Sequence, residues 1–217
     1  MSQKENSRRI SDYVVIALRD SDRIDGFFTR PGSERFEVFD AFDGRAGQTH
    51  PMFDTATFVA RNGAPPLPGE LGCAVSHYLV LRDFVARSRR AGDYLVVAED
   101  DVRLTADFLP VLNNVLRRPR ELEMVLLTDS WGTPPGSGKS RQLDIPAISP
   151  HMSWISTPVG PGFNPFRYRL ARFRNTAWGA HLYLIRKDVA EKYVAYVEQR
   201  GVSLWWLSSS CRDSGLV

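Results

Sequence analysis

The stretch Tyr94-Leu95-Val96-Val97-Ala98-Glu99-Asp100-Asp101 decides the fold class of this 217-residue chain. Its first five residues are all apolar, which is typical of a strand buried on both faces at the centre of a parallel sheet. Three carboxylates follow without a gap. Because parallel sheets bind their ligands just beyond the carboxyl ends of the strands, we expect these acids to border a binding site.

The three carboxylates are expected to point in different directions. Alternation along an extended chain sends Glu99 and Asp101 to one side and Asp100 to the other. Like charges this close repel one another unless a divalent cation or hydrogen-bond donors neutralise them, and carboxylate oxygens suit Mg²⁺ or Mn²⁺. Glu99 and Asp101 are therefore candidate metal ligands. The alternative is a solvated acidic turn that caps the next helix.

The remaining elements follow from apolar runs and helical periodicity. Strands are expected over 13–18, 36–42, 124–127 and 180–185, and helices over about 70–92 and over 108–116. A third helix is expected to begin at a capping box formed by Asp188 and Glu191 and to run through 197. This alternation predicts an α/β sandwich with a mainly parallel central sheet. We expect a flexible tail over 1–11 and a single domain over 12–217, with an irregular lid or acceptor insertion over 130–178.

Composition narrows the class of protein. Hydrophobic residues make up 43% and charged residues 24%, as in an ordinary soluble globule, and the net charge of +3 is too small to argue for nucleic acid. We expect Cys73 and Cys211 to be reduced thiols, and we see neither a secretory signal nor a membrane span. The prediction is a cytoplasmic protein with peripheral contact at the inner face of the membrane as an option.

Two histidines are candidates for chemistry. On the helix that begins near Gly69, the residues Glu70, Cys73 and His77 share one face, either simply as the start of a packed helix or facing a cleft. His181 opens a later strand, where it is either a late metal ligand near the acids or a core histidine, and the core interpretation is favoured.

Two further stretches have compositions that allow more than one interpretation. The segment 132–140 ends in Gly-Lys-Ser, but five residues separate the glycines where a P-loop has four, and Pro134 and Pro135 remove two backbone donors, so a lid is expected instead. In 163–174, arginines alternate with aromatic residues, which is typical either of contact with sugars, phosphates, bases or a membrane surface, or of an amphipathic helix with a solvated basic face.

Together these motifs resemble glycosyltransferase family 25, the lipooligosaccharide-type galactosyltransferases. The resemblance extends over about 13–197 and depends on these segments: Val15-Ile16-Ala17-Leu18 with Arg23, Phe42-Asp43-Gly44, Gly69-Glu70-Leu71-Gly72-Cys73-Ala74-Val75-Ser76-His77, Glu99-Asp100-Asp101-Val102 and Trp178-Gly179-Ala180-His181-Leu182-Tyr183-Leu184-Ile185. The segments GELGCAVSH and EDDV are specific for this family when they occur together, whereas either one alone is a weak signal.

The resemblance implies a GT-A-like, Rossmann-like sandwich that binds a nucleotide sugar. It further implies a UDP-sugar donor, transfer of galactose to a glycan or glycolipid acceptor in cell-envelope polysaccharide biosynthesis, and Mn²⁺ or Mg²⁺. By this analogy the donor-binding residues are Leu18, Arg23, Asp43, Glu70 and Asp100, and the metal ligands are Glu99 and Asp101.

An inverting displacement also needs a base that takes the acceptor's proton. Asp129, at the end of a neighbouring predicted strand, is the first candidate and His77 the second. The resemblance implies a longer stretch with further acidic residues after the last helix than this sequence shows. Asp213 is the candidate to replace one of those acids. A second hypothesis is therefore a catalytically inactive module that recognises a glycan or an assembly partner.

Overall fold

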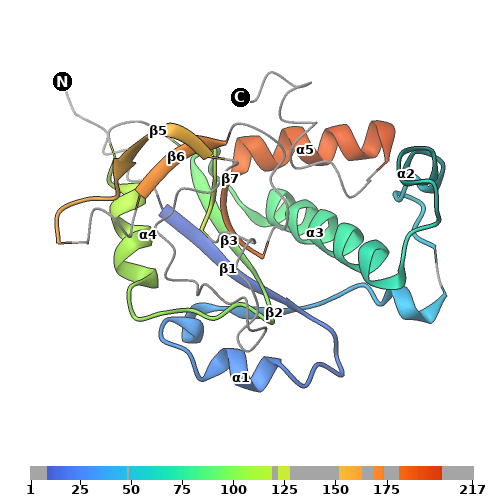
Figure 1. Cartoon of the computed structure of the whole chain (residues 1–217), viewed down its shortest axis with the longest axis horizontal. Helices are drawn as coiled ribbons and strands as arrows, with labels where there is room; N and C mark the ends of the chain where they lie inside the picture. Colours follow the sequence, from blue (N-terminus) through green and yellow to red (C-terminus); the bar gives the residue numbers. More distant parts are fainter. Residues whose placement is uncertain are drawn as a thin grey trace.

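The computed structural model describes residues 9–47, 49–118, 122–127, 152–162, 169–173 and 181–201, without the side chains of 152–157 and 169–173. A five-stranded sheet in the order β2-β1-β3-β7-β4 forms its centre (Figure 1). Its strands are β1 (Arg9–Ala17), β2 (Glu37–Asp40), β3 (Asp93–Glu99), β4 (Met124–Leu126) and β7 (Leu182–Arg186). β1 runs parallel to both β2 and β3, whereas β7 is antiparallel to β3 and β4. The sheet is thus mixed with a parallel core.

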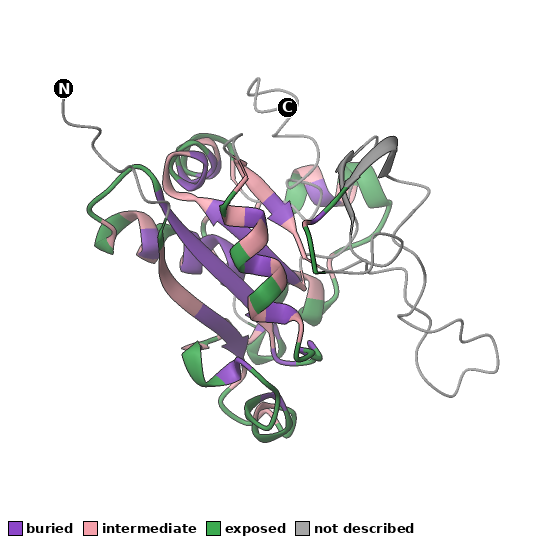
Figure 2. Cartoon of the chain, turned by 90° about the vertical axis from the view of Figure 1, so that its left-hand side faces the viewer, coloured by how far each residue is buried: buried purple, intermediate pink, exposed green. Residues whose placement is uncertain are grey.

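Helices cover both faces of this sheet. They are α1 (Ile24–Phe28), α2 (Thr55–Asn62), α3 (Pro68–Arg87), α4 (Phe108–Leu116) and α5 (Lys187–Arg200), with short 3-10 helices η1 (Ser33–Arg35) and η2 (Gly44–Ala46). One core cluster joins alternate strand residues to α2, α3 and α5, and a second joins the intervening strand residues to α1 and α4. The result is a three-layer α/β/α sandwich, in which β3 and β7 are the most buried strands and the helices expose their outer faces (Figures 1 and 2).

The interior of β3 explains why its sequence is apolar throughout. Leu95 and Val97 belong to the first cluster, while Tyr94, Val96 and Ala98 belong to the second. All five side chains are essentially inaccessible to solvent. A strand packed on both faces loses the alternation of apolar and polar residues. β3 is parallel to β1 but antiparallel to β7, so the prediction of a strand at the centre of a parallel sheet holds for one of its two neighbours.

Several predicted bounds differ from the structure. α4 spans the predicted residues, whereas β1 begins at Arg9, inside the stretch predicted as a tail, and α3 ends at Arg87 rather than near Gly92. The predicted capping box at the start of α5 is wrong, because Asp188 lies inside the helix. Its carboxylate instead accepts hydrogen bonds from Arg186, with Nε to Oδ1 at 2.5 Å.

A second, two-stranded sheet pairs β5 (Met152–Pro158) with β6 (Arg169–Phe173) in antiparallel fashion. Both strands fall within 130–178, so the prediction of an irregular segment is wrong for them. The alternative of an amphipathic helix over 163–174 is likewise wrong for 169–173. The rest of that stretch, including 132–140, lies outside the described residues.

Two glycines let the η2 turn approach the start of α3. A Cβ on Gly44 would lie 2.0 Å from the backbone oxygen of Pro68, and a Cβ on Gly72 would lie 2.9 Å from that of Phe42. Ser76 completes the contact, since its Oγ accepts a hydrogen bond from Phe42 N at 2.9 Å and donates one to Gly72 O at 2.6 Å. This packing holds α3 in place beside the end of β2.

Candidate functional site

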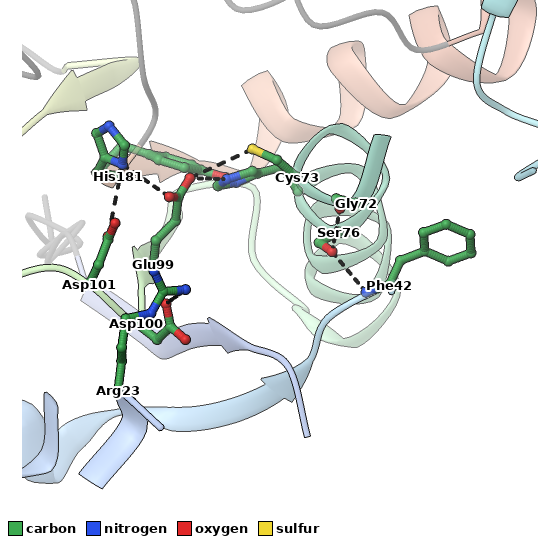
Figure 3. A network of polar contacts seen from close by, with 11 residues as sticks. Arg23, Phe42, Gly72, Cys73, Ser76, Glu99, Asp100, Asp101 and His181 are labelled. Atoms are coloured by element: carbon green, nitrogen blue, oxygen red, sulfur yellow. Dashed lines mark hydrogen bonds and ion pairs between the residues drawn. The ribbon is translucent and has the colours of Figure 1, made fainter. Parts of the chain in front are cut away.

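The direction of the strands brings the polar residues together at one edge of the sheet. The parallel strands β1, β2 and β3 end at this edge, and β7, which is antiparallel to β3, begins there. The backbone confirms the register: Glu99 N donates to His181 O at 2.8 Å. Glu99 and His181 therefore lie side by side although 82 positions separate them in sequence (Figure 3).

The Glu99 carboxylate is held on both of its oxygens. His77 Nε2 lies 3.1 Å and Cys73 Sγ 3.7 Å from Oε1, while His181 Nδ1 lies 3.0 Å from Oε2. Burial alone would raise the pKa of Glu99, but the hydrogen bonds from the two histidines outweigh it and hold that pKa well below its usual range. Glu99 is thus an oriented carboxylate that stays ionised.

Asp101 and His181 form the open side of this cluster. His181 Nδ1 lies 4.0 Å from Asp101 Oδ1, and ligand atoms of Glu99, Asp101 and His181 all lie within 4.8 Å of one another. The prediction that His181 is a core histidine is wrong, because its side chain is 38% exposed. Its hydrogen bond to Glu99 raises the pKa of His181 against the effect of burial.

His77 lies on the closed side of the same carboxylate. It is buried in α3, and its second ring nitrogen, Nδ1, lies 3.0 Å from the hydroxyl of the buried Tyr183 on β7. Both ring nitrogens are thus engaged inside the protein, which gives the imidazole no open position from which to take a proton from an acceptor. The geometry suits a residue that orients Glu99.

Asp100 points away from Glu99 and Asp101, as alternation along the strand predicts (Figure 3). It is buried, and its two oxygens bind the loop that follows β1. Ser21 Oγ donates to Oδ2 at 2.5 Å and Arg23 pairs with Oδ1 at 2.8 Å. The candidate donor-binding residues Arg23 and Asp100 therefore contact each other directly.

The other candidate donor-binding residues lie in the loops around this edge. Leu18 follows β1 directly, and its carbonyl accepts from Ser21 N at 3.0 Å. Asp43 caps η2 by accepting from Arg45 N at 2.9 Å, and the Arg45 guanidinium bridges Asp43 and Asp20, each at 2.8 Å. Hydrogen bonds from Arg45 lower the pKa of both carboxyls. The loops after β1 and β2 are thus tied to each other.

Glu70 serves the start of its helix. Its Oε2 accepts a hydrogen bond from Leu67 N at 2.8 Å, which satisfies a backbone donor at the start of α3. The structure thus supports the interpretation of this residue as a helix-start residue. Asp129 lies outside the described residues, so its assignment as the base stays a prediction.

Some residues of the site were missed by sequence reasoning. Cys73 was placed on the right helix face, yet nothing in the sequence indicated its contact with Glu99. Tyr183 looked like one apolar residue among others in its strand, and Ser21 like part of a polar turn. Only the strand order and the direction of β7 bring these side chains to the carboxylates.

Comparison with known proteins agrees with this architecture. The model of glycosyltransferase family 25 (LPS biosynthesis protein) matches residues 11–204, and the chain belongs to this family. The family implies the GT-A fold, which confirms the fold class predicted from the sequence. A search of curated proteins finds no significant match. Across the described residues, every helix is too short or too polar to cross a membrane.

Proposed function

We propose that this glycosyltransferase moves a hexose, galactose, from a UDP-sugar to a glycan or glycolipid acceptor, with inversion at the transferred carbon. Family membership supports the transferase class and its link to LPS biosynthesis. The cluster of Glu99, Asp101 and His181 at the carboxyl edge of the sheet is the observation on which the finer proposal depends. Action at the cytoplasmic face of a membrane stays part of this proposal.

The residues present suit a divalent cation. Glu99 Oε2 and Asp101 supply hard oxygen ligands, and His181 adds an imidazole nitrogen, a set compatible with Mn²⁺ and, through the carboxylates alone, with Mg²⁺. When bound, such an ion supplies positive charge that neutralises the departing nucleoside diphosphate. The ionised state of Glu99, maintained by its histidine partners, keeps the oxygen ligand available at neutral pH.

His77 acts in this proposal as a positioning residue rather than as the base. It fixes Oε1 of Glu99 from the protein interior, so that Oε2 faces the open side of the cluster. Asp129 is retained as the proposed base that takes the acceptor's proton. The expected effect of Asp129→Asn is a fall in kcat of about 100-fold or more with little change in the KM for the donor.

The donor contacts are proposed for Leu18, Arg23 and Asp43, which surround the same edge. Asp100 would act through Arg23, since it orients that half-exposed guanidinium. Such an arrangement leaves a half-exposed cation beside the site, where an anionic donor can approach. Glu70, occupied at the start of α3, is assigned no direct donor contact.

The decisive experiment measures Mn²⁺-dependent turnover of UDP-galactose by wild type, Asp101→Asn and Asp83→Asn. Asp83 is an exposed aspartate on α3 that pairs with Arg87 at 2.9 Å, so it controls for the loss of one surface charge. We expect Asp101→Asn to lose at least about tenfold in turnover, because even the outer partners of metal ligands cost about that much when they are lost, and Asp83→Asn to behave as wild type. Equal rates in all three proteins would refute the metal proposal.

The same assay tests the alternative of an inactive binding module. Isothermal titration with UDP and Mn²⁺ is run beside the turnover measurement. Tight binding of UDP without turnover of any sugar donor would support the binding module and contradict the transfer reaction. Release of the sugar with Mn²⁺, and its loss on chelation, supports the enzyme.

A further inference from the structure

A second group of ligand atoms lies on the side of Glu99 that faces α3. Cys73 Sγ, His77 Nε2 and Glu99 Oε1 all lie within 4.8 Å of one another, and they share only Glu99 with the acidic cluster. We propose that these three residues form a binding site for a thiophilic divalent cation, Zn²⁺. This site goes beyond the proposed transfer reaction, which needs neither Cys73 nor a thiophilic ion.

Two of the three separations between ligand atoms are close to those of a tetrahedral zinc site, and the third is below 4.8 Å. Ordinary zinc bonds to sulfur, nitrogen and oxygen at the tetrahedral angle put sulfur and oxygen about 3.6 Å apart and nitrogen and oxygen about 3.4 Å apart. The observed separations are 3.7 Å from Cys73 Sγ to Glu99 Oε1 and 3.1 Å from His77 Nε2 to the same oxygen. Small side-chain adjustments therefore suffice to place one ion between the three atoms.

Regular secondary structure carries all three ligands. Cys73 and His77 stand one turn apart on α3, so both project from the same face of the helix. Glu99 meets them from the end of β3. Tyr183 fixes the far nitrogen of the imidazole at 3.0 Å, which is the outer contact that orients a metal-binding histidine. With three ligands from protein, a fourth position is left for water, as in zinc sites that are open to solvent.

The site also has a route of entry. Cys73 is a partly exposed free thiol, whereas His77 behind it is buried. Burial and the Glu99 carboxylate raise the pKa of Cys73 to about 12, so the metal-free thiol keeps its proton. Forming the zinc–sulfur bond displaces that proton to solvent.

The two sites differ in ligand chemistry as well as in place. The acidic cluster uses Glu99 Oε2 with Asp101 and suits a hard cation, whereas the thiol and imidazole select a softer one. Substitution of Cys73 and of Asp101 should therefore separate the binding of two kinds of ion.

Co²⁺ is the spectroscopic probe for the thiol site, because a cobalt–thiolate bond produces a near-ultraviolet charge-transfer band. We titrate wild type, Cys73→Ser and Cys211→Ser, the last being the matched control for the chain's second cysteine. The band is expected in wild type and Cys211→Ser and absent in Cys73→Ser, with Zn²⁺ competing it away. Loss of a direct ligand should weaken Zn²⁺ binding by about 100-fold or more, at least as much as loss of an outer contact.

A band that persists in Cys73→Ser, or that is missing from wild type, would overturn the proposal. Should Cys73→Ser fail to fold, wild type alone provides the answer. In that case the rate of maleimide labelling of Cys73 is measured in wild type by peptide mapping, with and without Zn²⁺. The site predicts slower labelling with Zn²⁺, and unchanged labelling refutes it.

Asp101→Asn distinguishes this inference from the proposed function. It should retain the cobalt band while losing Mn²⁺ affinity, measured from the electron paramagnetic resonance signal of free Mn²⁺. Loss of the band in Asp101→Asn contradicts a separate thiol site. Unchanged Mn²⁺ affinity contradicts the hard-metal site instead.

Discussion

Gly72→Ala tests whether the close approach between α3 and the loop after β2 matters for stability. A methyl group here would lie 2.9 Å from Phe42 O and 3.4 Å from Gly44 N, both of them backbone atoms. The first distance is shorter than real Cβ contacts, so the helix or the loop must move. Such movement also strains the two hydrogen bonds of the Ser76 hydroxyl, which donates to Gly72 O at 2.6 Å and accepts from Phe42 N at 2.9 Å.

Gly69→Ala in the same helix is the matched control, because a Cβ there meets nothing within 4 Å. Both substitutions gain helix propensity of up to about 1 kcal/mol, so this gain largely cancels and the difference between the variants reports mainly the steric effect. Overpacking of a filled interior costs about 1–3 kcal/mol, and we expect Gly72→Ala to be less stable than Gly69→Ala by that amount.

The assay is urea unfolding followed by circular dichroism, supported by thermal melts. For a chain of this size the expected difference corresponds to about 2–4 °C in Tm per kcal/mol. Equal free energies of unfolding for the two variants, with unchanged slopes against urea, would refute the argument that Gly72 is required by the contact with Phe42.

The remaining predictions concern carboxylates. Asp100→Asn should lower the free energy of unfolding by about 1–3 kcal/mol, because it weakens charge-assisted hydrogen bonds of a buried group, whereas the half-exposed Asp101→Asn should change it by less than about 0.5 kcal/mol in the same urea assay. The hydrogen bond from Arg186 lowers the pKa of Asp188 from its ordinary 3.8, so the stability from this pair is present above that pH and lost as pH falls through the lowered folded-state value. Asp188→Asn should therefore show a shallower acid loss of stability in melts recorded below pH 4 than wild type, and parallel curves would contradict this origin.

Local sequence patterns predicted helices and strands better than they predicted which side chains and strands pair with each other. The unbroken apolar run in β3 gave a central strand because both of its faces are covered, and α4 follows from its own periodicity. The capping box failed at Asp188 because a side chain with the right spacing found a stronger partner in Arg186. β5 and β6 were missed because Gly, Pro and Ser are frequent in that stretch, and pairing between distant segments overrides local preference.

The sequence predicted the carboxylates of the candidate site but not the position of His181 beside them. Alternation alone separated Asp100 from its two neighbours, since that rule needs nothing beyond an extended backbone. The position of His181 required the direction of β7, which no local pattern encodes. A parallel strand would have carried its first residue to the opposite edge, and the antiparallel pairing places it beside Glu99.

The three consecutive acids thus have three different environments, and their proposed roles follow from these. Glu99 is held by residues of α3 and β7 and stays ionised, Asp101 is half-exposed and available, and Asp100 is buried against the loop after β1. A simple solvated turn would leave all three exposed and interchangeable. The difference between them shows that the protein fixes one carboxylate, leaves one half-exposed beside His181, and uses the third to hold the loop that carries Arg23.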